Sequence, residues 1–370
     1  MIVLLNALQA GNRSGTGRYT TELARWLPVL ADDLDFVVLW PRHVPHPHIE
    51  TAHREAFLLC DARTSLRRLY IDQIGVHGVR ARAGANVVHY PASVGCLTPI
   101  HNAVVTVHDL SFLHEPRWFR PGHAAYYRYA VGRTARLAER VIADSQVTAQ
   151  DLNEKLGIPR DRIDVVPLGV DERYRPAPPE AVVSVRTKYA LPKRFFLYLG
   201  TLEPRKNLVR VIEAWSRIAT ACPLDLVIAG RQGWRSRPIA RAIAAATRPE
   251  RVRCPGFIAE EDLPALLSAA EAFVWPSLWE GFGLPPLEAM ACGTPVLTSN
   301  VSSLPEVVGD AALMVDPYDI EAIAEGMLRL AEDAALRDQL RSLGLQRAAQ
   351  YTWRRTAQGA IDTYRAVLHL

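Results

Sequence analysis

Short, strongly apolar runs rich in β-branched residues recur along the chain, and each is followed by a stretch with apolar residues at helical spacing. Such runs are typical of strands buried on both faces, as in parallel sheets. They form two series, so the pattern predicts an α/β chain with two doubly wound, parallel-sheet domains. The first series is IVLLNA, FVVLW, NVVHY, AVVTVHD, RVIADS and IDVVPLG, and the second is FFLYLG, LDLVIAG, RVRCPGF, AFVWPS, PVLTS and ALMVD.

The break between the two series lies at residues 171–194 and contains a cluster of prolines. Because proline cannot continue a helix or sit in a central strand, this segment is predicted to be the linker. We therefore expect a first domain at residues 1–175 and a second at 183–352. The final segment, 353–370, has a helical pattern but does not connect two strands, so we expect it to pack across the domains.

Length and composition are those of an ordinary globular protein. The 370 residues are too many for one hydrophobic core, and 49% of them are hydrophobic. No run of about 18 uncharged apolar residues occurs that could span a membrane. The first apolar run has no basic residues before it, so we interpret it as a strand and not as a signal peptide. The five scattered cysteines indicate free thiols in a reducing cytoplasm.

Positive charge is concentrated in residues 63–140, which hold eleven arginines against four acidic residues. A basic face of this kind fits an anionic lipid surface or a nucleic acid. It also fits a solvated surface with arginines along helices, which is the commoner case. No recognition helix or aromatic stacking motif accompanies the charge, so no nucleic-acid partner is expected.

Ligands of open parallel sheets bind outside the carboxyl ends of the strands, so the loops there carry the candidate chemistry. After the first strand, Gly15 and Gly17 stand before a helix that we expect to begin near Arg18. Glycine lets the backbone approach a ligand closely, and free amides at a helix start suit phosphate. A simple tight turn explains the same pattern equally well.

A second polar loop follows the run AVVTV with His108 and Asp109. His108 is suited to donate a hydrogen bond to a substrate hydroxyl or phosphate, while Asp109 would fix its tautomer or contact the acceptor. Alternatively, Asp109 caps the next segment and His108 is a hydrogen-bonded residue at the rim. Asp144 and Ser145 end the next strand, and for them we favour helix capping.

In the second half, Arg205 and Lys206 follow the run FFLYLG. Arginine binds phosphate through two parallel hydrogen bonds and lysine acts as a point charge, so this pair suits a diphosphate. A solvated helix start is the alternative. Helix N-termini disfavour cations, however, so the position indicates a partner.

The most informative loop is LWEGFGLPPLEAMAC, after the run AFVWPS. Its two prolines are acceptable only in the first turn of a helix. Glu280 therefore lies just before a helix start and Glu288 about one turn inside it. A carboxylate near a helix start is also an ordinary helix signal, so one glutamate alone indicates little. Two glutamates around a turn with free amides fit a second interpretation, in which they hold hydroxyl groups of a sugar and a ribose while the amides receive phosphate. These amides belong to Phe282, Gly283 and Leu284.

With these residues assembled, the chain resembles the retaining glycosyltransferases of family 4, which have the GT-B fold, over nearly its whole length. The most specific motif is E-x7-E, here Glu280 to Glu288 in EGFGLPPLE, followed by GTPVLTSNVSSLPEVVGDAALMVDP. The pieces HD, DS, PLGVD, EPRKN and PGF occur in the family's order. The resemblance implies two Rossmann-like domains facing across a cleft, with the final helix returning to the first domain. The first domain would bind the acceptor and the second the nucleotide sugar.

The resemblance also implies a role for each loop. Glu280 and the three amides would contact the transferred sugar, and Glu288 would hold the ribose hydroxyls. The diphosphate would meet the cation pair and the first glycine loop. The remaining expected contacts are His108 with the sugar or its phosphate, Asp109 on the acceptor side, and Gly256 and Phe257 with the base. Some relatives have an arginine where this chain has Thr201, so the phosphate cations would be Arg205 and Lys206 alone.

No metal or other cofactor is expected, because cations and helix ends can neutralise the leaving diphosphate. The one D-x-D motif, Asp33 to Asp35, precedes a strand at its amino end and is interpreted as surface. Retention of anomeric configuration is inferred from the family, and the acceptor hydroxyl would lose its proton to the leaving phosphate.

The stretches HDLSFLHEPRWF and SNVSSLPEVVGDAA resemble mannosyltransferases of polysaccharide assembly. We therefore expect transfer of mannose from GDP-mannose to a glycan or lipid-linked acceptor of a cell-surface polysaccharide or lipopolysaccharide. The enzyme would be cytoplasmic, with peripheral contact to the inner face of the membrane. The alternatives are a UDP-glucose- or UDP-N-acetylglucosamine-dependent enzyme and a non-catalytic nucleotide-binding scaffold.

Overall fold

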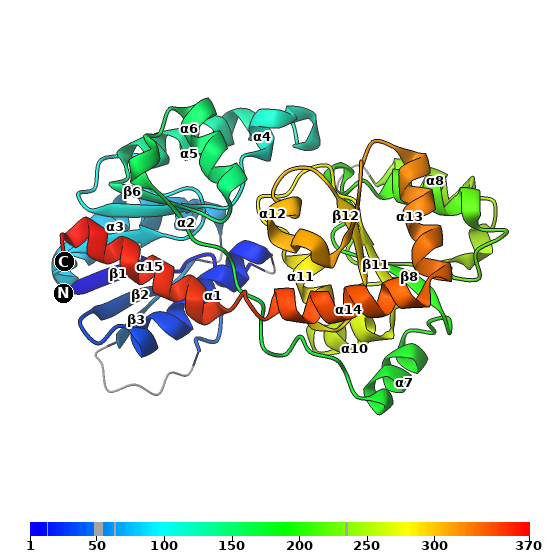
Figure 1. Cartoon of the computed structure of the whole chain (residues 1–370). Helices are drawn as coiled ribbons and strands as arrows, with labels where there is room; N and C mark the ends of the chain where they lie inside the picture. The colour runs from blue at the N-terminus through cyan, green and yellow to red at the C-terminus, as the bar shows by residue number, and fades with distance from the viewer. Residues whose placement is uncertain (13, 48–54, 63, 234–235) are drawn as a thin grey trace. The chain divides into compact units, whose positions relative to one another are not determined.

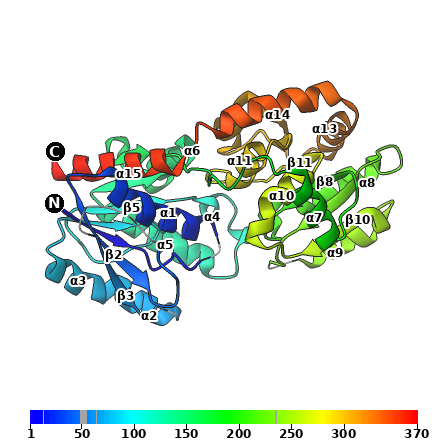
Figure 2. The ribbon, with the colours of Figure 1, turned by 90° about the horizontal axis from the view of Figure 1, so that it is seen from below.

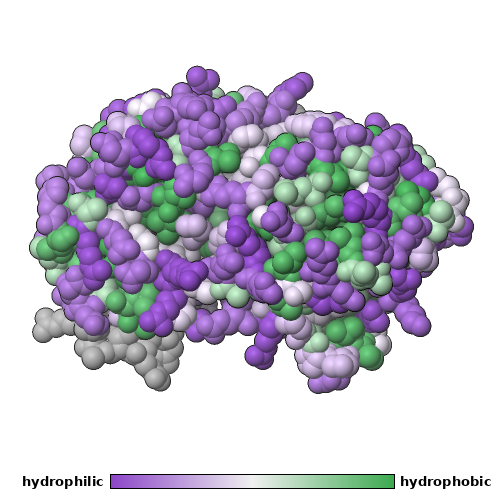
Figure 3. Space-filling model, in the orientation of Figure 1, coloured by the Kyte–Doolittle hydropathy of each residue, from purple (hydrophilic) through white to green (hydrophobic). Residues whose placement is uncertain are grey.

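The computed structural model describes residues 1–12, 14–47, 55–62, 64–233 and 236–370. Its internal contacts divide the chain into two units. Unit 1 comprises Met1–Gly169 and Thr352–Leu370, and unit 2 comprises Val170–Tyr351. On the face drawn in Figure 3, hydrophobic residues occur in small patches among hydrophilic ones. None of the described helices is long and apolar enough to cross a membrane.

Unit 1 contains, in its described part, a parallel sheet of seven strands in the order β3-β2-β1-β4-β5-β6-β7. Because the order reverses at β1, the sheet is doubly wound. The central strands are buried along their whole length, which explains their apolar sequences. The strands are β1 (Ile2–Asn6), β2 (Asp35–Pro41), β3 (Glu55–Cys60), β4 (Val87–Tyr90), β5 (Ala103–Val107), β6 (Arg140–Ala143) and β7 (Ile163–Val165).

Helices cover both faces of this sheet, with α1 and α15 together on one face and α2 and α3 on the other (Figure 2). The predicted return of the final helix to the first domain is confirmed, because α15 packs along α1 in Figures 1 and 2. The helices are α1 (Gly15–Leu30), α2 (Ser65–Tyr70), a π-helix (Ile71–Gly75), α3 (Val76–Ala83), α4 (Ser111–His114), α5 (His123–Leu137), α6 (Gln146–Leu156) and α15 (Trp353–Leu368), with 3₁₀ turns at Pro116–Trp118 and Arg160–Arg162.

Unit 2 contains a second parallel, doubly wound sheet in the order β10-β9-β8-β11-β12-β13. Two groups of helices pack on it, α8 with α9 and α13, and α10 with α7, α11 and α14 (Figure 1). The strands are β8 (Phe195–Leu199), β9 (Asp225–Ala229), β10 (Val252–Gly256), β11 (Ala272–Trp275), β12 (Val296–Ser299) and β13 (Leu313–Val315).

The helices of unit 2 are α7 (Pro179–Lys188), α8 (Leu208–Ile218), α9 (Arg237–Ala244), α10 (Leu263–Ala269), α11 (Leu284–Ala291), α12 (Leu304–Val308), α13 (Ile320–Glu332) and α14 (Ala334–Ala348). Short 3₁₀ turns lie at Pro204–Lys206, Pro249–Arg251, Glu260–Asp262 and Gly309–Ala311. The two parallel-sheet domains and the fold class predicted from the sequence are therefore confirmed.

Three local predictions need correction. The segment predicted as linker contains helix α7, since Pro179 occupies its first turn, where no backbone N–H is needed, and α7 packs on α10. The first helix begins at Gly15 and not near Arg18, so both glycines lie in its first turn. The apolar pattern also missed β3, an edge strand in which Leu58 and Leu59 are half exposed. Arg63, the first arginine of the basic segment, lies outside the described residues.

Candidate functional site

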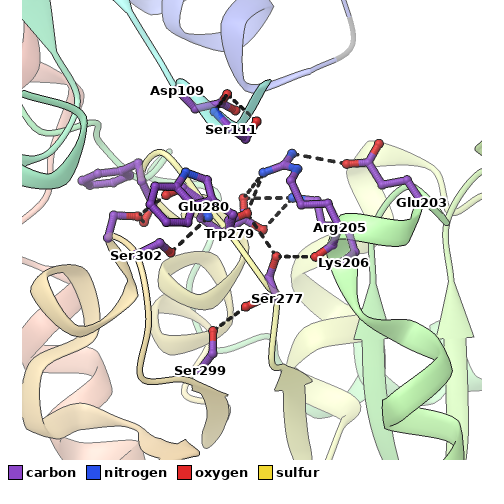
Figure 4. A network of polar contacts seen from close by, with 12 residues as sticks. Asp109, Ser111, Glu203, Arg205, Lys206, Ser277, Trp279, Glu280, Ser299 and Ser302 are labelled. Carbon is purple, nitrogen blue, oxygen red and sulfur yellow. Dashed lines mark hydrogen bonds and ion pairs between the residues drawn. The ribbon is translucent and has the colours of Figure 1, made fainter. Parts of the chain in front are cut away.

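The centre of the candidate site in unit 2 is a buried ion cluster around Glu280 (Figure 4). Lys206 donates to both carboxylate oxygens of Glu280, with Nζ 2.7 Å from Oε1 and 2.9 Å from Oε2. Arg205 donates from Nη1 to Glu280 Oε2 at 3.2 Å and from Nη2 to Glu203 Oε1 at 3.2 Å. Two cations and two carboxylates therefore share one site, drawn from the loops after β8 and β11.

Because little water reaches this cluster, the charges in it interact strongly with one another. Glu280 is only 6% exposed, and the Lys206 side chain is 12% exposed. Burial alone would raise the pKa of Glu280, but Lys206 and Arg205 outweigh it and lower that pKa to about 2. Burial and the charge of Arg205 lower the pKa of Lys206, although Glu280 opposes this. The alternative of a solvated cation pair is therefore wrong: the cations are largely shielded from solvent and are paired.

The Lys206 side chain lies over an aromatic ring, which in turn stacks on a second ring. Its ammonium lies 4.9 Å from the centroid of the Trp275 ring, close enough for a cation–π interaction. The Trp275 ring stacks on Tyr198 at 5.0 Å. Trp275 is the last residue of β11 and Tyr198 the last but one of β8, so the sheet holds the rings on which the ammonium rests.

Asn207 holds the cation loop in place. It adopts a left-handed conformation with φ of 60°, and its side-chain Nδ2 donates to Pro276 O at 2.9 Å and to Pro317 O at 2.7 Å. These bonds tie the loop after β8 to the loops after β11 and β13. Sequence analysis missed Asn207 and Glu203, although both flank the cations within EPRKN.

The E-x7-E turn is shaped by serines of the loop after β12. Ser302 Oγ accepts from the Glu280 amide at 3.1 Å, and Ser303 Oγ donates to the carbonyls of Glu280 and Phe282 at 2.9 and 2.7 Å. Gly283 has φ of 118°, and an added Cβ would come within 2.8 Å of a Leu304 side chain. The turn therefore requires glycine at this position.

The second glutamate, Glu288, lies within α11 and is 6% exposed. The helix begins at Leu284, directly after Gly283, with both prolines in its first turn as predicted. Phe282 precedes it as a buried residue whose ring contacts Tyr351 edge to face at 5.7 Å. The two glutamates thus bracket a helix start, but a role for Glu288 stays a prediction.

The residues expected around the base lie at the same edge of the sheet. Gly256 ends β10 with φ of 81°, and Phe257 follows with half of its side chain exposed. Thr201 follows β8, two strands away in the order β10-β9-β8. The parallel direction of these strands places all three residues at carboxyl ends, where ligands of such sheets bind.

In unit 1, His108 is paired with Asp144 and not with Asp109, which corrects the expectation that Asp109 fixes its tautomer. Nδ1 lies 2.7 Å from Asp144 Oδ2, and Nε2 lies 2.9 Å from Pro91 O. Both partners are acceptors, so a doubly protonated ring satisfies both. Although burial alone would lower the pKa of His108, Asp144 and these hydrogen bonds raise it.

The other polar residues at these two strand ends, Asp109, Asp144 and Ser145, each have a different role. Asp109 Oδ1 accepts from the amide and the hydroxyl of Ser111 at 3.1 and 2.8 Å, so it does cap the next segment. Ser145 caps α6 through a bond from Thr148 N, as predicted. The helix-capping interpretation of Asp144 is wrong, because this carboxylate binds His108 instead.

The glycines of the first loop have a packing role. An added Cβ on Gly17 would lie 1.8 Å from the Asn12 carbonyl oxygen, so α1 starts tightly against the loop. Gly15 is the first residue of α1. Their expected contribution to phosphate binding stays a prediction.

The D-x-D motif lies on the surface, as predicted. Asp33 accepts from Arg365 at 2.7 Å on the outside of unit 1, and Asp35 begins β2. Within the described residues, no group of three or more His, Cys, Asp or Glu side chains is arranged to hold a metal ion. All five cysteines are free thiols.

Comparison with known proteins places both units in glycosyltransferase families. Residues 13–174 match the family described as Glycosyltransferase Family 4, and residues 185–347 match the family described as Glycosyl transferases group 1. The chain is 35% identical over 269 residues to O-antigen chain mannosyltransferase B of Escherichia coli, covering 72% of this chain and 71% of that protein.

A second relative is the serotype-specific mannosyltransferase WbdA of Escherichia coli, 34% identical over 273 residues. The match covers 72% of this chain but only 33% of WbdA, so the chain spans about a third of that longer protein. Among solved structures, sucrose-phosphate synthase from Thermosynechococcus elongatus superimposes with a TM-score of 0.75 at 22% identity, covering 100% of this chain and 99% of that one.

Proposed function

Because the chain belongs to glycosyltransferase family 4 and has the GT-B fold, we propose that it is a retaining mannosyltransferase that uses GDP-mannose. It is a hexosyltransferase of polysaccharide assembly, and the finer assignment of the donor is supported by its similarity to O-antigen mannosyltransferases. The observation that carries the proposal is the buried pairing of Glu280 with Arg205 and Lys206.

The charges of this cluster suit the transfer chemistry. The bond between the anomeric carbon and the phosphate oxygen breaks, which leaves positive charge on the sugar and negative charge on the nucleoside diphosphate. Arg205 and Lys206 would turn from Glu280 to the diphosphate. Glu280 would then accept hydrogen bonds from hydroxyl groups of the sugar. Because the two cations are already held together in unit 2, they need only be transferred from Glu280 to the diphosphate when the donor binds.

The rest of unit 2 would hold the nucleotide. The backbone amides of Phe282, Gly283 and Leu284 at the start of α11 would contact the sugar and its phosphate, and Glu288 would bind the ribose hydroxyls. Phe257 is half exposed, and with Gly256 it would contact the base. These residues share the carboxyl-end edge of one sheet, which supports assigning residues 183–352 to donor binding.

Unit 1 would bind the acceptor. Its candidate group is His108, which carries positive charge when both ring nitrogens donate to Asp144 and Pro91. We propose that this charge faces the sugar or its phosphate, and that Asp109 lies on the acceptor side. The acceptor oxygen forms the new bond to the anomeric carbon, and its proton passes to the leaving phosphate.

A thermal-shift panel with GDP, UDP, ADP and their sugar conjugates tests the donor. A ligand at a hundred times its dissociation constant stabilises the fold by about 2.7 kcal/mol, which such a panel resolves. We expect selective stabilisation by GDP and GDP-mannose. Stabilisation by UDP and its sugars alone would replace mannose by glucose or N-acetylglucosamine, and no effect of any nucleotide would favour the scaffold.

We also propose that the arginine-rich part of unit 1 contacts an anionic membrane, where a lipid-linked acceptor would be found. Tyr70 and Tyr129 are each 60% exposed, and Ile74 is similarly exposed. Exposed Arg67 and Arg128 lie close to them in sequence. Aromatic rings with arginine suit a lipid interface. Binding to phosphatidylglycerol vesicles that salt weakens supports this proposal, whereas equal binding to phosphatidylcholine vesicles contradicts it.

A further inference from the structure

Four polar side chains in unit 1 form one continuous, fully buried chain of hydrogen bonds. Tyr364 Oη lies 2.7 Å from His89 Nδ1, and His89 Nε2 lies 2.8 Å from Thr106 Oγ1. Thr106 Oγ1 in turn lies 2.8 Å from Tyr19 Oη. The four residues come from α15, β4, β5 and α1, so the chain connects the last helix of the protein to its first helix through the sheet.

This network is costly to bury and therefore calls for an explanation. All four side chains have no exposed surface, and burial lowers the pKa of His89 to about 3, which keeps its ring neutral. Apolar residues would fill the same space without any need for partners. A fully bonded polar network, by contrast, permits one arrangement of its members, because a displaced member leaves a buried group unpaired.

The network ends against the candidate residue of unit 1. The ring of Tyr19 meets the ring of His108 edge to face, with centroids 5.0 Å apart and an angle of 84° between the planes. His108 is also held by Asp144 and Pro91 through its two nitrogens. Tyr19 thus supplies the packing contact from α1, and the hydrogen bond between Tyr19 and Thr106 fixes the place of Tyr19.

We propose that Tyr364 is a positioning residue for His108, acting through His89, Thr106 and Tyr19, so that docking of the C-terminal helix sets the geometry of the unit 1 site. The inference rests on the role of His108 given under Proposed function. It gives α15 a role in the reaction in addition to its packing role in unit 1.

The first test compares two single substitutions on the same helix. Tyr364→Phe removes only the hydroxyl that begins the network. The matched control, Thr363→Val, removes a neighbouring buried hydroxyl that donates to Asp164 at 3.0 Å and has no link to His108 in this network. We expect Tyr364→Phe to lower kcat by up to about a hundredfold, the cost of a misplacement of about 1 Å. The KM for the donor and the kcat of the control should be unchanged.

A second pair of variants breaks the network at its middle. Thr106→Val keeps the shape but removes the hydroxyl, whereas Thr106→Ser keeps the hydroxyl. We expect the valine variant to behave like Tyr364→Phe and the serine variant to retain most of the activity. Loss in both variants to the same extent would mean that packing matters and the hydrogen bonds do not, which overturns the inference. This pair also serves if Tyr364→Phe does not fold.

A double-mutant cycle distinguishes positioning of His108 from general damage. If Tyr364 acts through His108, then Tyr364→Phe should have little further effect in a His108→Gln background. An equal fold-loss in both backgrounds would overturn the inference. Full activity of His108→Gln alone would instead refute the role of His108 given under Proposed function, and the next measurement then decides the inference by itself.

That measurement is the titration of the His108 ring by NMR, which needs no activity. The groups facing His108 are Asp144, Asp109, His89 and Tyr19. If Tyr19 is released, water reaches the ring and changes both the burial that lowers the pKa of His108 and the pairing with Asp144 that raises it, so this pKa should shift in Tyr364→Phe and Thr106→Val. It should stay unchanged in Thr363→Val. A His108 titration in Tyr364→Phe identical to that of the unmodified protein would overturn the inference.

Discussion

The ammonium of Lys206 lies 2.7 Å from the carboxylate of Glu280, and the two side chains are only 12% and 8% exposed. The two charges come from loops 74 residues apart in the sequence. Each is the reason that the other can be buried, since an isolated charge in this position would be expensive. Lys206 therefore stabilises unit 2 through its bond to Glu280, and it is also a group that would bind an anionic ligand.

Removing one partner of this pair should destabilise the protein. In Lys206→Ala, Glu280 keeps the longer bond from Arg205 but loses the two bonds and the charge of Lys206, so we expect the free energy of unfolding to fall by about 3 kcal/mol. Urea unfolding followed by circular dichroism measures this change. The matched control is Lys188→Ala, because Lys188 also binds a carboxylate, that of Asp262, but is 52% exposed. An equal loss in both variants would contradict the account.

Nucleotide affinity should fall at alkaline pH. Burial and Arg205 lower the pKa of Lys206 in the free protein, and a bound diphosphate would raise it again. The diphosphate thus favours the protonated lysine, so affinity should be constant below the free-state pKa and decline above it. Calorimetric titration with GDP at increasing pH checks this. In Lys206→Arg the decline should disappear, because guanidinium stays protonated there; an unchanged decline would exclude Lys206 as its source.

Asp144→Asn should lower the pKa of His108. The carboxylate is what outweighs burial, so without its charge burial should take the pKa of His108 below the ordinary value. The alkaline limb of the kcat profile should then move to lower pH. The control, Asp151→Asn, alters a similar pair with His114 at 2.6 Å and should leave the profile in place.

The pairing of His108 with Asp144 should also make the stability of the protein depend on pH. A histidine whose pKa is raised by folding contributes stability that is complete below its unfolded value of about 6.5 and is lost as pH rises through the folded value. Asp144→Asn should remove this part of the pH dependence. If the pH dependence of unfolding is identical in both proteins, Asp144 does not hold a charged His108.

Gly17→Ala should be poorly tolerated. Its Cβ would lie 1.8 Å from a backbone oxygen, so the first turn of α1 or its loop must shift, at a cost of about 1–3 kcal/mol or more. Gly78→Ala is the matched control in α3, where no atom lies within 4 Å of the added Cβ. Alanine should stabilise that helix slightly. Thermal unfolding of the two variants decides between these outcomes, and equal midpoints would contradict the close approach.

Much of the fold follows from local pattern. Continuous apolar runs such as β5 identify strands covered on both faces, and the prolines after Gly283 identify the first turn of α11. The pairing of His108 with Asp144 could not be read in this way, because the two residues are 36 positions apart and Asp144 also fits a helix cap. A contact such as that between Tyr364 and His89, 275 positions apart, depends on where the last helix docks.

Local sequence patterns also gave wrong predictions where a residue type occurs in two kinds of structural environment. The predicted start of α1, near Arg18, is too late because glycine suits both a loop and a first helical turn. The sequence predicts the cation pair but assigns Glu280 to the sugar alone, since no pattern in it shows that Glu280 pairs with Lys206. Charge pairing between loops needs the sheet order that brings β8 beside β11.

The most direct test of the proposed function is transfer of radiolabelled mannose from GDP-mannose to lipid-linked oligosaccharide acceptors. The protein and its Lys188→Ala variant should transfer label to the same extent, with retained anomeric configuration in the product, while Lys206→Ala transfers little or none although it remains folded. Transfer by Lys206→Ala at the unmodified rate would contradict the assigned site. Transfer from a UDP-sugar but not from GDP-mannose would contradict the assigned donor.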